Sequence, residues 1–584
     1  MTDTTSDTRT PAAWLPPEPG RRTRSETLVT PLSDGTELLA RLTTGADGAA
    51  RPVMLVRTPY GEPMSRTLPV QGALDAGFAV VVQQCRGTCG SGGELRTFEN
   101  ERDDGLETIA WLREQPFCDG RIVMFGHSYL GMTQMAVVGD NPEGLMAISP
   151  VVTPHDYRDG LVFRQGAFQL GQAVSWHTLK SAEVLQDLRA RGEDVADLVT
   201  AFGALAASPE AFRALPLRER PVFRELIPSW RTWVEGENDA SYWHAISYRK
   251  RRAAARVPAL HVGGWYDLFL SGTLENFRDM AAHSPGQHLI VGPWVHADYG
   301  DVTGELHFPG ASGRAIGLEQ QQLGFLRAAV DGEPSTMPAV QVYVMGANRW
   351  RTFDAWPPRE ATPAPWHLHA DGTLAEPAPE AESAHLEWVH DPTDPVPTVG
   401  GSSLIVGGID GRPSYAPGPR DQRLLDERDD ILRFTSAELA SPLEVVGEVT
   451  VTAHVATDAR DGDVVARLID VYPDGRAIGV ADGIARLRYR NGMDDPRPLE
   501  PGEVVEVTVD LVGTAHAFGI GHRIRVDIAG SDFPKYDRNS GTAKPAAEVT
   551  DGDLRPIRQR LHLDRHHPTR LTLPVVQADP RVSG

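Results

Sequence analysis

Cysteine is scarce, and this limits how the chain can be stabilised covalently. Only three of the 584 residues are cysteines, too few for a disulfide framework. Cys85 and Cys89 are four residues apart, and no second Cys/His pair stands nearby to complete a zinc site. We therefore expect reduced thiols, no bound metal and a cytoplasmic location.

Long hydrophobic runs and excess positive charge are also missing. No window approaches the roughly 18 continuous apolar residues of a membrane span. Residues 1–25 are polar and proline-rich without the pattern of a secretory signal, which predicts a flexible lead-in. The net charge of −22 argues against nucleic acid or an anionic membrane as partner. A small-molecule partner is expected, and a homo-oligomer is left open.

Short apolar runs separated by helical patterns dominate the first part of the chain. Unbroken Val/Ile/Leu runs are typical of parallel strands that helices cover on both faces. Alternation of such strands with helices predicts an α/β sheet. The runs occupy residues 53–58, 78–83, 122–125, 259–262, 288–291 and 340–345.

A segment of about a hundred residues interrupts this alternation. No strand-like run occurs between residues 154 and 255, and an apolar stripe at helical spacing lies within the segment. We interpret 154–255 as a helical cap inserted into an α/β domain made of residues 26–153 and 256–348. The stripe consists of Val195, Leu198, Val199, Phe202 and Leu205.

The remaining residues, 349–584, follow a different pattern. Proline is dense at first, and the later segments alternate apolar and polar residues with period two. In one of them, Val449, Val451, Ala453 and Val455 share a face. Alternating strands separated by turns predict a C-terminal antiparallel jelly-roll β-sandwich.

The stretch VMFGHSYLGMTQ, residues 123–134, carries the first candidate catalytic group. An apolar strand ends at Gly126, Ser128 follows two residues later, and Gly131 lies in the next helical pattern. A strand, a sharp turn and a helix expose a serine as a nucleophile elbow. The usual motif is Gly-x-Ser-x-Gly, and here Leu130 stands where the second glycine is expected.

A nucleophilic serine needs a base, and the base needs an orienting acid. Asp267 and His296 each follow a predicted strand, in the chain order Ser, Asp, His of this type of fold. His296 would take the proton of Ser128, and Asp267 would hold the imidazole. Four other histidines compete for the role of base: His127, His155, His261 and His288.

An oxyanion intermediate needs two hydrogen-bond donors. The backbone amide of Tyr129, directly after the serine, is one candidate. The second should come from the loop after an earlier strand, where Tyr60 follows residues 53–58. From the residues alone, packing explains Tyr60 better than catalysis does.

These motifs resemble the cocaine esterase and α-amino-acid ester hydrolase group, the CocE/NonD-type hydrolases related to X-prolyl dipeptidyl peptidases. The likeness covers nearly the whole chain. It is carried by RTPYG (57–61), RGTCGSGGEL (86–95), residues 103–134, GGWYDLF (263–269), GPWVH (292–296), RWRTFDAWPP (349–358) and residues 462–490. The family's motif Gly-x-Ser-Tyr-x-Gly accounts for the late glycine.

The resemblance implies an α/β-hydrolase domain, a helical cap and a C-terminal jelly roll. It also implies Ser128, Asp267 and His296 as catalytic triad, and the Tyr60 hydroxyl and Tyr129 amide as oxyanion hole. Phe269 would line the acyl pocket. Two positions depart from the family pattern: Gln84 replaces a frequent aspartate, and His127 replaces a small apolar residue.

Acyl transfer to water through an acyl-enzyme is therefore the expected reaction, on a carboxylic ester or an amide and without a cofactor. Trp265 and His127 are, with Phe269, the tentative pocket residues, although the tryptophans near the site could equally be core. Three alternatives remain: acyl transfer to an amine or alcohol, X-Pro dipeptidyl-peptidase activity, and an inactive binding or scaffold protein.

Overall fold

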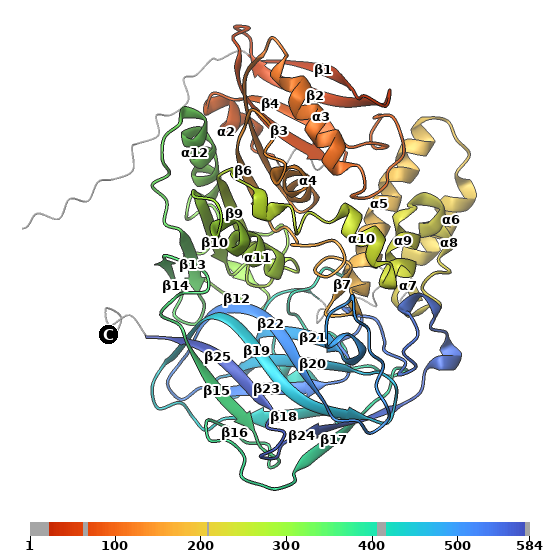
Figure 1. Ribbon diagram of the computed structural model, residues 1–584, viewed down its shortest axis with the longest axis vertical. Coiled ribbons are helices and arrows are strands. Elements are labelled where there is room, and N and C mark those ends of the chain that lie inside the picture. The colour runs from red at the N-terminus through yellow and green to blue at the C-terminus, as the bar shows by residue number, and fades with distance from the viewer. Residues whose placement is uncertain (1–22, 62–67, 207–209, 406–415, 578–584) are drawn as a thin grey trace, which may run out of the picture.

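The computed structural model describes residues 23–61, 68–206, 210–405 and 416–577. The molecule has an α/β part and a β-rich part, which lie at opposite ends of the view in Figure 1. No helix in the described ranges combines the length and apolar character that a membrane crossing requires.

A ten-stranded sheet forms the centre of the α/β part. Its central seven strands, β4 to β13, are parallel, and an antiparallel strand or hairpin closes each edge. The spatial order is β1 (Thr23–Pro31), β2 (Glu37–Gly45), β4 (Ala79–Gln84), β3 (Arg51–Thr58), β5 (Cys118–His127), β6 (Leu145–Val151), β9 (Ala259–Gly264), β10 (Gln287–Gly292), β13 (Val340–Val344) and β14 (Arg349–Phe353).

Burial explains why the central strands read clearly in the sequence. The side chains of residues 53–56 are fully buried, as are those of residues 122–124, because helices pack over the sheet. Connecting helices that contact it are α2 (Val70–Asp75), α3 (Glu101–Arg113), α4 (Tyr129–Val138), α11 (Leu270–Ala281) and α12 (Leu318–Asp331). The expected α/β class is confirmed.

Both edges of the sheet differ from the sequence expectation. Strand β1 begins at Thr23, inside the predicted lead-in 1–25, whose first 22 residues lie outside the described ranges. Strand β14 pairs with β13, so the boundary drawn after residue 348 falls within a hairpin. Edge strands are hard to recognise because they are partly exposed and carry polar residues: β1 is exposed along most of its length.

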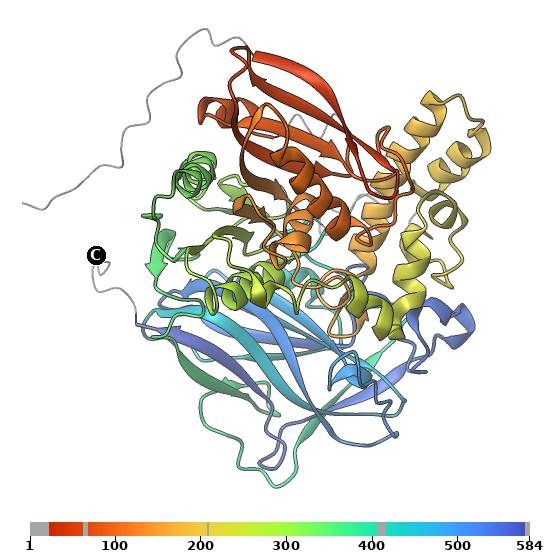
Figure 2. The same ribbon diagram turned by 45° about the horizontal axis from the view of Figure 1, so that its top comes forward.

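The segment between β6 and β9 is mainly helical, with one short hairpin. Figures 1 and 2 show its helices beside the α/β sheet. Its elements are β7 (Phe163–Arg164), β8 (Ala167–Phe168), α5 (Leu170–Ala190), α6 (Ala196–Ala206), α7 (Glu210–Arg213), α8 (Pro221–Leu226), α9 (Ser229–Glu235) and α10 (Ala240–Ile246).

Two antiparallel sheets make up the β-rich part. The alternating residues Val449, Val451, Ala453 and Val455 are fully buried, as their period predicts. One sheet contains β16 (Leu374–Ala375), β15 (Thr362–Leu368), β25 (Arg570–Val576), β19 (Leu443–Thr457), β24 (Ile557–His562) and β17 (His385–His390), with β22 (Val505–Phe518) also paired to β19; the other contains β18 (Ile431–Thr435), β23 (Arg523–Ala529), β20 (Asp463–Val471) and β21 (Ala477–Arg486).

A shared hydrophobic core joins the two parts. Leu289 and Val342 of the α/β sheet belong to the same buried cluster as Val445 of the β-rich part. The backbone amide of Met345 donates to the carbonyl of Ala515 at 2.9 Å, which links β13 to β22. The β-rich part is therefore packed against the side of the sheet that carries β10 and β13.

Candidate active site

The turn between β5 and α4 has a strained backbone at Ser128. Its φ of 58° and ψ of −123° lie in a region that residues with a Cβ rarely adopt. Such a conformation costs on the order of 1–3 kcal/mol and clusters at functional sites. The turn places Ser128 at the N-cap of α4 and at the carboxyl edge of the parallel sheet, where ligands bind in open α/β sheets.

Close packing accounts for both glycines of the turn. A Cβ on Gly126 would lie 2.4 Å from Cβ of Leu130, and one on Gly131 would lie 2.1 Å from Oγ1 of Thr153. Gly131 is therefore required where α4 crosses the chain that follows β6. The position after Tyr129 needs no glycine, because buried Leu130 packs back on Gly126.

Three side chains from separate loops form one hydrogen-bonded line. His296 Nε2 lies 3.0 Å from Ser128 Oγ, and His296 Nδ1 lies 2.6 Å from Asp267 Oδ2. Asp267 follows β9 and His296 follows β10, two neighbouring parallel strands. The structure thus brings together the three residues that the sequence predicts as nucleophile, base and orienting acid.

The surroundings fix the acid and the imidazole. The Asp267 side chain is fully buried, and its Oδ1 accepts a hydrogen bond of 2.7 Å from the amide of Phe269. The Phe269 ring stands nearly perpendicular to the His296 ring, with centroids 5.5 Å apart. An imidazole with Nδ1 on a carboxylate keeps Nε2 free to accept the serine proton.

The competing histidines are held elsewhere. His261 Nε2 contacts Gln287, and His288 Nδ1 contacts the carbonyl of Pro338. Burial, with the positive charge of Arg252 nearby, lowers the pKa of His155 to about 3. Within the described residues, none of these three imidazoles hydrogen-bonds Ser128.

His127, next to the serine, faces a different space. It lines a cavity of about 560 Å³ together with apolar residues such as Phe125 and Val151. Ala297, directly after His296 in the chain, also lines this cavity, whereas Ser128, Asp267 and His296 do not line it. Burial, with His296 nearby, lowers the pKa of His127 to about 4. His127 therefore lines the cavity as an uncharged imidazole at neutral pH.

Tyr60 is oriented by the helical segment. Its hydroxyl accepts a hydrogen bond of 3.0 Å from Nε1 of Trp176 on α5. An indole N–H only donates, so the hydroxyl proton of Tyr60 stays available for another acceptor. Burial raises the pKa of Tyr60, which keeps this proton in place. Trp176 was missed because a tryptophan in an apolar helix reads as core.

The Tyr129 side chain anchors the start of α4. Its hydroxyl donates to Glu101 Oε1 at 2.8 Å, and Glu101 also pairs with buried Arg57 at 2.9 Å. The Tyr129 amide is the first of α4 and has no acceptor within the helix. It is therefore free to donate toward an anion formed at Ser128. Sequence reasoning missed Glu101, which the helical pattern assigns to an ordinary first turn.

The two tryptophans beside the triad residues are core. Trp265 is 3% exposed, donates to the carbonyl of Tyr343 at 2.8 Å and packs on Trp356. Trp294 is fully buried and donates to the carbonyl of Ala311. Trp265 therefore belongs to the junction between the two parts of the molecule, and its tentative place in the pocket is not supported.

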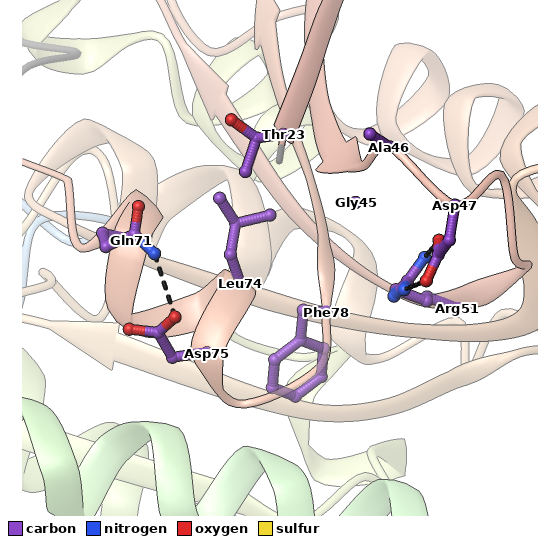
Figure 3. A pocket seen from close by; sticks show the side chains of 9 residues that line it. All are labelled: Thr23, Gly45, Ala46, Asp47, Arg51, Gln71, Leu74, Asp75 and Phe78. Carbon is purple, nitrogen blue, oxygen red and sulfur yellow. Dashed lines mark hydrogen bonds and ion pairs between the residues drawn. The ribbon is translucent and has the colours of Figure 1, made fainter. Parts of the chain in front are cut away.

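A smaller hollow of about 190 Å³ lies near the start of β1. Figure 3 shows two pairs among its polar side chains: Arg51 with Asp47, and Gln71 with Asp75. It contains no residue of the triad.

Comparison with known proteins agrees with this geometry. The sequence profile of the X-Pro dipeptidyl-peptidase (S15 family) matches residues 34–298, and that of the X-Pro dipeptidyl-peptidase C-terminal non-catalytic domain matches residues 335–572. Cocaine esterase of Rhodococcus sp. (strain MB1 Bresler) is 34% identical, with 96% of this chain and 99% of that protein aligned.

Solved structures resemble the whole chain. An aminopeptidase from a marine sediment archaeon, Thaumarchaeota archaeon, superposes with a TM-score of 0.80 at 26% identity, covering 98% of this chain and 99% of that one. An α-amino acid ester hydrolase superposes with a TM-score of 0.78 at 26% identity, covering 98% and 100%. The chain therefore belongs to the family of serine hydrolases that includes cocaine esterase and α-amino acid ester hydrolase and shares its two domains with the X-Pro dipeptidyl peptidases.

Proposed function

We propose that this protein hydrolyses carboxylic esters through an acyl-enzyme on Ser128. The observation that carries the proposal is the line from Ser128 Oγ through His296 to Asp267, with distances of 3.0 and 2.6 Å. His296 removes the hydroxyl proton as Ser128 attacks the ester carbonyl. Asp267 stabilises the imidazolium that forms, because its carboxylate is buried against Nδ1.

Charge then develops on the carbonyl oxygen. We assign its stabilisation to the Tyr129 amide and the Tyr60 hydroxyl, each supplying roughly 3 kcal/mol of the barrier reduction. The Tyr60 hydroxyl is already oriented by its hydrogen bond from Trp176, so it needs little reorientation as the negative charge develops. His296 next protonates the leaving alcohol, and a water deprotonated by the same imidazole releases the acid and restores Ser128. The cycle uses no metal or cofactor.

The volume and lining of one cavity support a substrate class. We place a bulky acyl or aromatic group in the 560 Å³ cavity beside His127, whose lining combines apolar residues such as Phe125 and Val151 with the charged Arg314 and Glu319. In this proposal Phe269 flanks the imidazole and the acyl group. The helical segment 154–255 serves as a cap that holds Tyr60 through Trp176, and the β-rich part folds as a jelly roll that supports the edge of the site.

The other expected activities have less support. The family profile is named for X-Pro dipeptidyl peptidases. In contrast, the relative that aligns with 96% of this chain is named an esterase. Transfer to an amine or alcohol would use the same acyl-enzyme. An inactive scaffold would not need a strained serine in line with its base. The free thiols of Cys85, Cys89 and Cys118 favour a reducing cytoplasm, and the acidic net charge disfavours nucleic acid or anionic membranes.

A panel of p-nitrophenyl esters, aminoacyl esters and X-Pro anilides tests the proposal. Wild type should hydrolyse at least one ester and carry a covalent acyl adduct visible by mass spectrometry. Ser128→Ala should lose roughly a millionfold in kcat and form no adduct. Equal turnover by wild type and variant would reject the mechanism, and preference for an added amine over water would favour the acyltransferase.

A further inference from the structure

A second group of polar side chains lies in the β-rich part, far along the chain from the triad residues. His562 ends β24, and Asp564 and His567 lie in the loop that leads to β25. One ligand atom from each of these three residues lies within 4.8 Å of the other two. We call these three residues the histidine cluster. Strands β24 and β17 are at the end of the molecule away from β1 and β2 (Figure 1).

Strand register adds a row of further polar side chains. His454 of β19 is the cross-strand partner of His562, and Glu506 of β22 is the partner of His454. Cross-strand partners have Cβ atoms about 4.5–5.5 Å apart on the same face of a sheet. Accordingly, the His454 and His567 rings have centroids 5.4 Å apart, and the His562 and His567 rings 5.3 Å apart.

Several of these imidazole nitrogens are buried without a hydrogen-bond partner. They are Nδ1 of His454, Nε2 of His562 and Nδ1 of His567, the last of which lies 3.3 Å from Asp564 Oδ1. A buried polar atom that lacks a hydrogen-bond partner is unfavourable, and three in one place call for an explanation.

The carboxylates complete the chemistry of a cation site. The Asp564 side chain is 6% exposed, and its Oδ1 accepts hydrogen bonds from the amides of His566 and His567 at 2.9 and 3.0 Å. Its Oδ2 faces His562 Nδ1 at 3.8 Å. Glu506 Oε2 lies 3.2 Å from His454 Nε2 and orients that ring, as outer carboxylates do for metal-binding histidines.

We propose that the histidine cluster binds a divalent transition-metal ion of the Zn²⁺ class, with His562, Asp564 and His567 as ligands and His454 as the fourth. Imidazole and carboxylate ligands suit Zn²⁺, which binds them at about 2.0–2.2 Å. Bonds of that length would draw the three ligand atoms, which lie within 4.8 Å of one another, closer together. His567, 40% exposed, opens the site to solvent. The ion would tie β19, β24 and the following loop together.

Zinc titration of the chelator-treated chain without a polyhistidine tag tests this proposal. Wild type should bind one equivalent of Zn²⁺ with micromolar affinity or tighter, measured by calorimetry. Bound Co²⁺ should give the intense visible absorption of a four-coordinate site. Loss of outer partners alone weakens metal sites 10–100-fold, so the double variant His562→Asn/His567→Asn should lose roughly 100-fold or more.

His367→Asn is the matched control. His367 also lies on a strand of this sheet, and its Nδ1 hydrogen-bonds the carbonyl of Glu376, away from the histidine cluster in sequence. It should bind Zn²⁺ like wild type. Zn²⁺ should raise the melting temperature of wild type and control, but not of the double variant. If the double variant does not fold, His567→Asn alone should weaken binding at least about tenfold. No stoichiometric binding by wild type, or equal binding by wild type and the histidine variants, would overturn the proposal and leave the cluster as packed imidazoles.

Discussion

The triad is built from residues distant in sequence, whereas the three residues of the histidine cluster lie within the six-residue segment 562–567. The triad residues follow β5, β9 and β10, and parallel strands bring all such loops to one edge of the sheet. The approach of His454 to that segment depends instead on how antiparallel β19 and β24 are aligned. Strand order therefore suffices to gather the triad, whereas strand register brings His454 to the histidine cluster.

The two groups also differ in how firmly they are held. In the triad, each polar atom of Asp267 and His296 has a partner. In the cluster, buried nitrogens of His562 and His567 lack one. A satisfied network is preorganised for chemistry, whereas the unsatisfied one has capacity left for a ligand. The triad is thus complete in its hydrogen bonds, whereas the proposed ion would complete those of the histidine cluster.

Asp267→Asn should give the largest loss of activity among the variants that leave Ser128 and His296 in place, because it removes the carboxylate that orients the base. An asparagine at this position no longer stabilises the imidazolium and favours the wrong tautomer of His296. We expect kcat/KM on the best ester to fall about 10⁴-fold while the fold is kept. Stopped-flow or steady-state kinetics with circular dichroism as control will measure this. A loss smaller than tenfold would show that the buried carboxylate does not orient the base.

Tyr60→Phe should have the next largest effect. It removes the hydroxyl that Trp176 orients but keeps the ring that packs edge-on against Tyr129. One oxyanion donor contributes roughly 10²–10³ in kcat, so we expect a loss of about a hundredfold or more with little change in KM. An unchanged kcat would remove Tyr60 from the oxyanion hole and leave it as a packing residue.

The smallest effect on catalysis is expected from the histidine cluster. His562→Asn/His567→Asn changes a sheet that contributes no triad residue, so kcat/KM at 25 °C should stay within about twofold of wild type. Ester hydrolysis with and without added Zn²⁺ is the measurement. A tenfold change that Zn²⁺ reverses only in wild type would mean that the two regions are energetically coupled through the core they share.

Sequence patterns predicted the buried parts of the fold better than its edges. The central strands at residues 53–56 and 122–124 are fully buried, so both faces are apolar and the runs are unmistakable. Strand β1 is largely exposed, and β14 is only partly buried, so neither differs much from a loop in composition. The domain boundary drawn after residue 348 therefore falls within the β13–β14 hairpin.

Site residues follow the same rule. Ser128, Asp267 and His296 were predictable because each stands directly after an apolar run and the chain order of a triad is fixed by strand order. Trp176 and Glu101 were not, because their roles depend on contacts across the chain: one with Tyr60, the other with Tyr129 and Arg57. Trp265 was predicted to line the pocket because it stands close to Asp267 in the sequence. Closeness in sequence does not tell which way a side chain points, and Trp265 is buried in the core.

The sequence by itself determined the parallel sheet, the helical insertion, the alternating strands and the three loops of the triad. Local hydrophobic periodicity encodes all of these, because burial imposes it residue by residue. Only the tertiary structure decided that Trp176 orients Tyr60, that Trp265 is core and that His454 lies opposite His562. Those facts depend on helix placement and strand register, which are set by the packing of distant segments and leave no periodic trace in the chain.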